Sequence, residues 1–396
     1  MKLVTVHTAA QVHDFITLPQ YLYAKDENYI QPLEKDILAV FDPAQNPHLQ
    51  KGVFCRWVVY NSANKPVGRV AAFTGYGQQG KAGEPVGAMG FFESINDIQV
   101  ANLLFDACKK WLQGHGLEGM DGPVNFGERD RWWGLLIDGF LPPSYCMNYN
   151  PPYYRQLFEN YGFKIWFKQY TFYRRITDPV PDKYKQRAEQ LLSNPLYRFE
   201  HIQKRHLERY ALQFMEVYNK AWGAIHPNFT PITPEQAIKL MNSMKPIIDE
   251  KIIYFGYYQN EPIGFFICLP EINSIVKLLH GQFTLWHRLK FWWYLKSGYC
   301  KRMFGLVFGV APQHQQKGVE SALVMAASQV LQSGFYTRYA DMELTWIGDF
   351  NPIMVNIARG LGGKLHKTHA TYRCWFEEGK PVIHHEIITQ PHLAKF

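Results

Sequence analysis

The chain has 396 residues, 47% of them hydrophobic, which suits a globular protein of two domains with large cores. Lysine and arginine exceed the acidic residues by 42 − 34 = 8, which favours an anionic partner such as a phosphorylated cofactor, a nucleic acid or a membrane surface. The six cysteines show no C-x-x-C spacing, which argues against a zinc knuckle or a disulfide framework. Without a signal-peptide pattern or a long apolar run, the sequence predicts a cytoplasmic protein with no transmembrane segment.

The same series of structural signals occurs twice along the chain. Each copy has a hairpin pattern, a strand, a helix, an Asn-Pro pair and a helical run that ends in glycine. Asn150 and Asn351 are 351 − 150 = 201 positions apart, and Gly162 and Gly363 are 363 − 162 = 201 positions apart. A period of this length indicates duplicated domains rather than a solenoid.

The two prolines of Asp178-Pro-Val-Pro-Asp182 mark a linker between the copies. We therefore expect an N-terminal lobe over residues 1–178 and a C-terminal lobe over residues 183–396. The sequence pattern of each copy predicts helices, a hairpin, a central strand, a helix, another strand, a helix and a final strand. The expected fold class is α/β (α+β), with a mixed, mostly antiparallel sheet flanked by helices in each lobe.

One segment, Phe283–Arg302, is both aromatic and basic and holds three tryptophans. It can be interpreted as a membrane-surface helix. The interpretation that we favour is a helix that packs its aromatic side chains between the two lobes, because a chain this rich in aromatic residues needs such seams.

The second copy contains a candidate anion-binding loop. The apolar run Phe304–Ala311 predicts a buried strand, a polar turn follows, and Val319 begins a helix with one apolar face. Free backbone N–H groups at a helix N-terminus attract anions, and Gly318 lets the backbone come close to a phosphate. An ordinary strand–loop–helix connection remains the alternative. The expected cofactor-binding residues of the turn are Gln315, Gln316, Lys317, Gly318 and Val319.

The first copy differs at the same place. It offers Glu93 and Asp97 where the second copy has Gln315, Lys317 and Gly318. Carboxylates repel a pyrophosphate, so we expect the cofactor to bind only the second copy.

These residues resemble the GNAT superfamily of acyl-CoA-dependent N-acyltransferases. The turn Gln315–Gly318 fits the cofactor loop of that family, although Glu320 stands where the family keeps a small residue. Glu343–Ile347 looks like the fifth strand of the family, and Asn351 like the asparagine that faces the pantetheine arm. The whole chain resembles tandem, two-lobed GNAT proteins, and in particular uncharacterised bacterial members with the stretch matched here by Gly122–Phe126.

The resemblance implies an N-acyltransferase that uses acetyl-CoA or another acyl-CoA. The thioester carbonyl of the acyl-CoA would be polarised by the backbone N–H of Val310 or Ala311. Glu343 is the expected general base, with a pKa raised by partial burial, and its alternative role is a strand-edge partner of a lysine or arginine. The tyrosine that often donates the proton is replaced by Ala358, so the role would pass to Tyr372, to His366 or to water.

The acceptor, a small-molecule or peptide amine, is expected between the lobes. Clustered polar and aromatic residues on long loops favour function, although the tryptophans can also fill a seam. His366 and His369 are expected at the surface, and no metal site is predicted. The expected acceptor-binding residues are Asn125, Glu128, Arg129, Trp132, Asn148, Tyr149 and His226.

Two other hypotheses remain at this stage. A non-catalytic ligand-binding protein on a GNAT scaffold is favoured by Glu320 and by the missing helix tyrosine. Nucleic-acid binding has only the net charge in its favour, and we do not expect it. The protein is expected to be a monomer or a homodimer.

Overall fold

The computed structural model describes residues 1–75, 84–126, 131–223, 229–334 and 336–388. Its strands are β1 (Lys2–Thr5), β2 (Phe54–Tyr60), β3 (Pro66–Phe73), β4 (Val86–Ser94), β5 (Gly119–Gly122), β6 (Leu135–Asp138), β7 (Lys164–Arg175), β8 (Tyr197–His201), β9 (Ile253–Tyr258), β10 (Glu261–Pro270), β11 (Arg302–Val310), β12 (Asp341–Gly348) and β13 (Lys364–Trp375). Its α-helices are α1 (Ala9–Leu22), α2 (Glu34–Val40), α3 (Ile98–Gly114), α4 (Tyr154–Tyr161), α5 (Asp182–Leu192), α6 (Leu207–Gly223), α7 (Pro234–Met244), α8 (Asn273–Val276), α9 (Leu285–Lys296), α10 (Val319–Leu331) and α11 (Pro352–Gly360).

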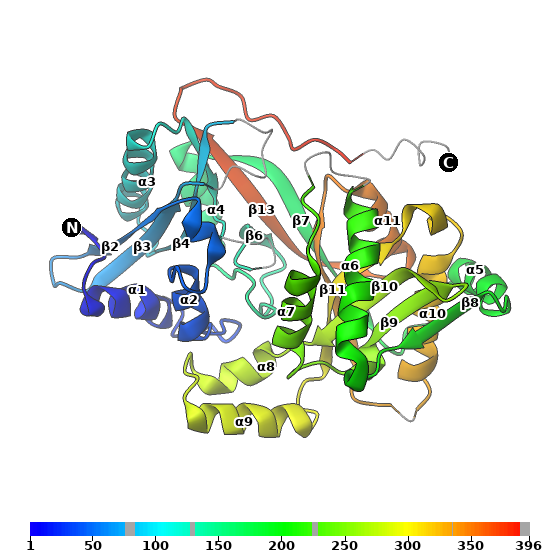
Figure 1. The fold of residues 1–396 in the computed structure, drawn as a ribbon. Coiled ribbons are helices and arrows are strands. Elements are labelled where there is room, and N and C mark those ends of the chain that lie inside the picture. Colours follow the sequence, from blue (N-terminus) through cyan, green and yellow to red (C-terminus); the bar gives the residue numbers. More distant parts are fainter. Residues whose placement is uncertain (76–83, 127–130, 224–228, 335, 389–396) are drawn as a thin grey trace.

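All these strands belong to one sheet that runs through the whole molecule (Figure 1). The strand order is β1-β2-β3-β4-β5-β13-β7-β12-β11-β10-β9-β8, and β6 pairs with β13 beside this path. Among the described strand pairs, β4–β5 and β11–β12 are parallel and the others are antiparallel. The predicted fold class, with mostly antiparallel strands flanked by helices, is confirmed.

The final strands of the two copies are exchanged. β13, which ends the second copy, lies between β5 and β7, whereas β7, which ends the first copy, pairs with β12. The two exchanged strands also pair with each other along most of their length, from Lys364 opposite Tyr173 to Arg373 opposite Lys164. The sequence predicts both strands but not the exchange, because the local pattern decides that a strand forms and not which strand it pairs with.

In the C-terminal lobe, helices cover both faces of the sheet. Along β10, Phe265 and Ile267 pack into a cluster with α6 and α7, while Phe266 and Cys268 pack into a cluster with α10. This alternation is the period of two that a strand imposes on its side chains. α6 and α10 therefore lie on opposite faces.

Only the inner face of the aromatic segment fills a seam between the lobes, where Phe291 and Leu295 pack with Leu33. Within α9, Phe291 and Leu295 are buried, but Trp286 is 73% exposed and Trp293 is 65% exposed. The favoured packing interpretation is therefore wrong for these two tryptophans. Among the described residues, no helix combines the length and the apolar character that crossing a bilayer requires.

Candidate functional site

A wedge opens between the two parallel strands β11 and β12. They are paired only from Arg302 to Gly305, opposite Asp341 to Leu344, and diverge beyond this point. β12 bulges there, and Trp346 takes a left-handed backbone conformation with φ of 63°. A cavity of about 690 Å³ occupies the wedge. The divergence of the strands thus opens a cavity in the C-terminal lobe.

This cavity passes through the sheet. On one side it is lined by α10 and α11, through residues such as Ser321 and Ile357. Its lining also includes Ala221 and Trp222 of α6, which covers the opposite face. A ligand threaded through the wedge can therefore reach both faces of the sheet.

The predicted anion-binding loop stands at one end of the wedge. Gln316 and Gly318 both have positive φ, of 63° and 92°, and Gly318 is the N-cap of α10. Successive turns of this kind make a concave row of backbone N–H groups that binds anions. Here the Glu320 carboxyl group lies beside the backbone N–H groups of Gln316 and of Glu320 itself, which act to lower its pKa. Burial outweighs them and raises the pKa of Glu320, but the carboxyl group still occupies space beside donors that an anion could use.

Four cationic side chains line the same cavity: Arg174, Arg175, Lys183 and Arg187. The backbone of Arg187 comes so close to the loop that a Cβ on Gly318 would lie 3.2 Å from its carbonyl oxygen. These cations stand outside the loop motif, on α5 and on the end of the exchanged strand β7. Sequence reasoning missed Arg174 and Arg175 because the strand exchange that brings them to the cavity leaves no local signal.

The predicted cofactor residues divide into two groups. Gln315, Gln316, Gly318, Val310 and Asn351 line the cavity. Lys317 is exposed and Val319 is buried in the core, and neither is part of the lining.

The two candidate backbone donors differ in what they already bind. The N–H of Ala311 donates to the carbonyl of Ile263 at 2.8 Å, so the prediction that Ala311 polarises a ligand carbonyl is wrong. Val310 remains a cavity-lining candidate, and its own carbonyl accepts the side-chain amide of Gln315 at 3.0 Å. Asn351 caps α11 by accepting the N–H of Met354 at 3.2 Å.

The corresponding wedge of the first copy is filled by the chain itself. Beyond the pairing of β4 with β5, the N–H of Val124 donates to the carbonyl of Met89 at 2.8 Å. A Cβ on Gly90 would lie only 1.9 Å from the carbonyl oxygen of Val124, so glycine is needed for this close approach. Trp132 packs in the same cluster as Val124. The backbone therefore approaches β4 closely at the place where the second copy opens its cavity.

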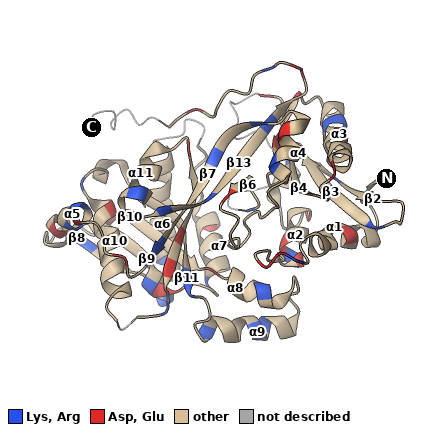
Figure 2. Cartoon of the chain, turned by 180° about the vertical axis from the view of Figure 1, so that it is seen from behind, with Lys and Arg blue, Asp and Glu red and all other residues tan. Residues whose placement is uncertain are grey.

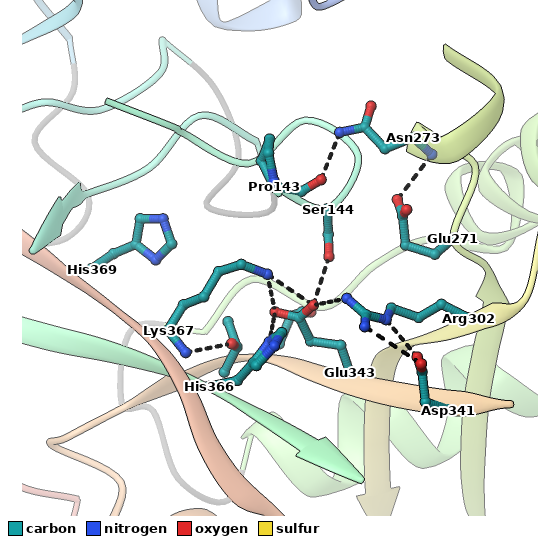
Figure 3. A network of polar contacts seen from close by, with 12 residues as sticks. Pro143, Ser144, Glu271, Asn273, Arg302, Asp341, Glu343, His366, Lys367 and His369 are labelled. Carbon is teal, nitrogen blue, oxygen red and sulfur yellow. Dashed lines mark hydrogen bonds and ion pairs between the residues drawn. The ribbon is translucent and has the colours of Figure 1, made fainter. Parts of the chain in front are cut away.

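Glu343 is fully buried in a network of charged side chains (Figure 3). Lys367 donates to both carboxylate oxygens, at 2.7 and 2.9 Å, and Arg302 lies 3.3 Å from one of them. His366 Nδ1 is 3.1 Å from Oε1, and Ser144 donates to Oε2 at 3.2 Å. Because Ser144 belongs to the first copy and Arg302 to the second, the network joins the lobes.

The prediction that burial raises the pKa of Glu343 is wrong. Burial alone acts in that direction, but the hydrogen bonds and charges of His366 and Lys367 outweigh it and hold the pKa well below its ordinary value. A carboxylate that stays ionised is a weak proton acceptor near neutral pH. The arrangement matches the alternative role, a carboxylate paired with lysine and arginine, and Glu343 is not among the cavity-lining residues.

Tyr372 lies away from the wedge. It is fully buried in the core of the N-terminal lobe, because β13 is exchanged into that half of the sheet. Its hydroxyl donates to the Glu159 carboxylate at 3.1 Å, and burial raises its pKa. The expected role of Tyr372 as proton donor in the cavity is therefore wrong.

The predicted acceptor residues are only partly brought together. Trp132, Asn148 and Tyr149 line a second, much smaller cavity beside Glu93 and Arg69. Asn125 is buried, 3% exposed, and is not part of that lining. The remaining predicted residues, Glu128, Arg129 and His226, lie outside the described residues.

His369 is buried rather than exposed, contrary to the prediction, with 2% of its surface accessible. Its Nε2 lies 3.0 Å from the carbonyl oxygen of Asn148, and because a carbonyl only accepts, Nε2 carries the proton. Its ring stacks on Trp346, with 6.3 Å between centroids. Burial lowers the pKa of His369 to about 4. The imidazole is therefore neutral near pH 7.

This burial predicts a pH-dependent loss of stability. The unfolded chain binds a proton on His369 near its ordinary pKa of 6.5, whereas the folded protein binds it only near pH 4. The contribution of His369 to the free energy of unfolding is therefore complete above about pH 6.5, and it falls by about 3 kcal/mol as the pH drops toward 4. His369→Gln, which keeps a donor for Asn148, should flatten urea-unfolding stability across this window. If the free energy of unfolding changed with pH equally in the variant and in the wild type, burial of His369 would not be the cause of the change.

The sheet, with one parallel strand pair in each half and a divergence between β11 and β12, has the GNAT fold in tandem form. Among solved structures, a tandem GNAT protein from the clavulanic acid biosynthesis pathway aligns with a TM-score of 0.55 at 10% identity, over 96% of this chain and 99% of that one. A GCN5-related N-acetyltransferase from Sphaerobacter thermophilus aligns with a TM-score of 0.50 at 11% identity, over 96% and 98%. No family model matches the chain.

Two relatives align over nearly the full length. The chain is 27% identical over 384 residues to a bacterial ceramide synthase of Caulobacter vibrioides (strain NA1000 / CB15N), covering 94% of this chain and 97% of the relative. It is 26% identical over 364 residues to Protein YghO of Escherichia coli (strain K12), covering 90% and 91%.

Proposed function

We propose that this protein is an N-acyltransferase that moves an acyl group from an acyl-CoA thioester to the amine of a long-chain amino alcohol. The observation that carries the proposal is the cavity in the β11–β12 wedge, which has cations at the anion-binding loop and crosses the sheet. A ceramide is the amide of a fatty acid and such an amino alcohol. The similarity to a ceramide synthase over 94% of the chain therefore supports this acceptor class.

The cavity offers a place for each part of an acyl-CoA. The phosphates would lie at the N-terminus of α10, where Arg187 and Lys183 supply positive charge. The pantetheine arm would follow the wedge past Val310 and Asn351. Trp346 lines the wedge, and its buried indole N–H has no hydrogen-bond partner among the described residues, so it can donate to a ligand carbonyl.

The reaction would form a C–N bond and break the C–S bond of the thioester. The amine nitrogen attacks the thioester carbon, the thiolate leaves, and the proton that the amine loses ends on the departing sulfur. Held in one cavity, the two reactants meet without the entropic cost of a bimolecular encounter.

One prediction concerns Glu320, whose carboxyl group lies beside backbone N–H groups of the anion-binding loop. Glu320→Ala removes this internal competitor and leaves those donors to the ligand. We expect acyl-CoA to bind at least about fivefold more tightly. The N–H groups that are left free can donate charge-assisted hydrogen bonds to the phosphates of the ligand, and such bonds are stronger than neutral ones. Isothermal titration calorimetry measures this, and weaker binding by the variant would show that Glu320 supports the loop instead.

The function itself is tested by following thiol release when the protein is mixed with acyl-CoA thioesters and a long-chain amino alcohol. We expect thiol release only when both substrates are present. The rate of release should increase with the length of the acyl chain, up to the length that the wedge accepts. Binding of acyl-CoA without any amine-dependent release would favour the alternative of a non-catalytic ligand-binding protein.

A further inference from the structure

Helix α9 presents an apolar face to the outside of the molecule. Successive members of this face are three or four positions apart or adjacent, so they share one side of the helix. Large apolar side chains gathered in a contiguous exposed patch mark interaction sites. The outer face consists of Leu285 (78% exposed), Trp286 (73%), Leu289 (63%), Trp292 (38%) and Trp293 (65%).

The opposite face of α9 is apolar as well. Phe291 and Leu295 pack with Ile275 and Leu279 of the preceding turns and with Leu33 of the N-terminal lobe. α9 therefore carries apolar side chains on two faces, with its cations between and beside them. The inner face of α9 packs against the rest of the protein, and the outer face is exposed. Figure 1 shows α9 as the outermost element at that end of the molecule.

The charged side chains of α9 and of the chain on either side of it have one sign. Residues 272–302 contain no aspartate or glutamate. Figure 2 shows blue and no red on α9. Arg288 and Lys296 are exposed on the helix, and Lys277 and Lys301 are exposed on either side of it. Tryptophan side chains favour the boundary between water and lipid, and cations beside them favour anionic headgroups.

We infer that the outer face of α9 docks the protein onto an anionic lipid bilayer. The helix lies in the plane of the interface, with Trp286 and Trp293 inserted at headgroup depth and Arg288 and Lys296 contacting lipid phosphates. Its 12 residues are too few to cross the hydrocarbon layer. The surface is separate from the β11–β12 wedge, so the inference stands independently of the proposed acyl transfer. It provides a route by which lipidic substrates and products are exchanged with a membrane.

The inference is tested by sedimenting the full-length protein with vesicles of phosphatidylcholine, with or without phosphatidylglycerol. We expect binding to the anionic vesicles that weakens with salt. The double variant Trp286→Ala, Trp293→Ala should bind at least about tenfold more weakly. The double variant Arg288→Glu, Lys296→Glu should lose most of the preference for phosphatidylglycerol.

Ile383→Ala is the matched control, because Ile383 is 77% exposed but lies outside α9, and it should bind like the wild type. Thermal unfolding and acyl-CoA binding of all variants should be unchanged, which separates this result from failure of the proposed function. Wild-type protein that ignores both vesicle types, or tryptophan variants that bind normally, would overturn the inference. So would a lipid-free dimer that the tryptophan variant dissociates, since the face would then join two copies of the chain.

Discussion

Gly318→Glu is expected to abolish acyl-CoA binding, with a loss of about a hundredfold or more in affinity. The substitution puts a carboxylate at the N-cap of α10, beside the backbone N–H groups that would hold the phosphates. Isothermal titration calorimetry with acyl-CoA measures the loss. Because a ligand that binds only the folded state stabilises it, the thermal shift with acyl-CoA should disappear as well.

The control for this variant is Gly162→Glu. Gly162 also has positive φ, 111°, so the same side chain meets the same backbone strain, but it lies at the end of α4 and nothing is within 4 Å of its Cβ position. Its acyl-CoA affinity should be that of the wild type. Arg187→Ala adds a variant at an exposed position, where folding is not at risk, and should weaken binding about tenfold. Normal binding by both Gly318→Glu and Arg187→Ala would place the ligand elsewhere.

Lys367→Met is expected to destabilise the protein by about 3 kcal/mol or more. It removes the cation that donates two hydrogen bonds to Glu343 and leaves a fully buried carboxylate with fewer partners. Urea unfolding measures the loss. The double variant Lys367→Met, Glu343→Gln removes both charges and should be less destabilised than the sum of its parts.

Lys220→Met is the matched control for the lysine substitution. Lys220 is paired with Glu216 at 2.6 Å, but both side chains are largely exposed, so the change should cost about 0.5 kcal/mol or less. If Lys367→Met cost no more than Lys220→Met, the buried network would not hold the lobes together as its geometry implies. A double variant with additive losses would show that Lys367 and Glu343 act independently.

Local sequence signals predicted the elements that form the site, but not their neighbours. The turn Gln315–Gly318 was found because an apolar strand, a polar turn and an amphipathic helix follow each other along the chain. Arg174 was missed because it reaches the cavity on a strand exchanged from the other copy. No local pattern records such an exchange, since strand pairing is a long-range choice.

The same limit explains the wrong roles given to two residues. Tyr372 was expected in the wedge because its strand ends the second copy in sequence, yet that strand completes the first half of the sheet. Glu343 was correctly expected on a strand, but the direction of its pKa shift depends on Lys367 and His366, which lie on another strand. Burial can be inferred from a sequence pattern, whereas the charge that compensates it cannot.

The most direct test of the proposed acyl transfer is mass spectrometry of the lipid products formed from an isotope-labelled acyl-CoA and a long-chain amino alcohol. Wild-type protein should place the label in the amide, and Gly318→Glu should not. Label found only in free fatty acid, or no turnover despite saturating acyl-CoA, would contradict the assignment of this protein as an N-acyltransferase.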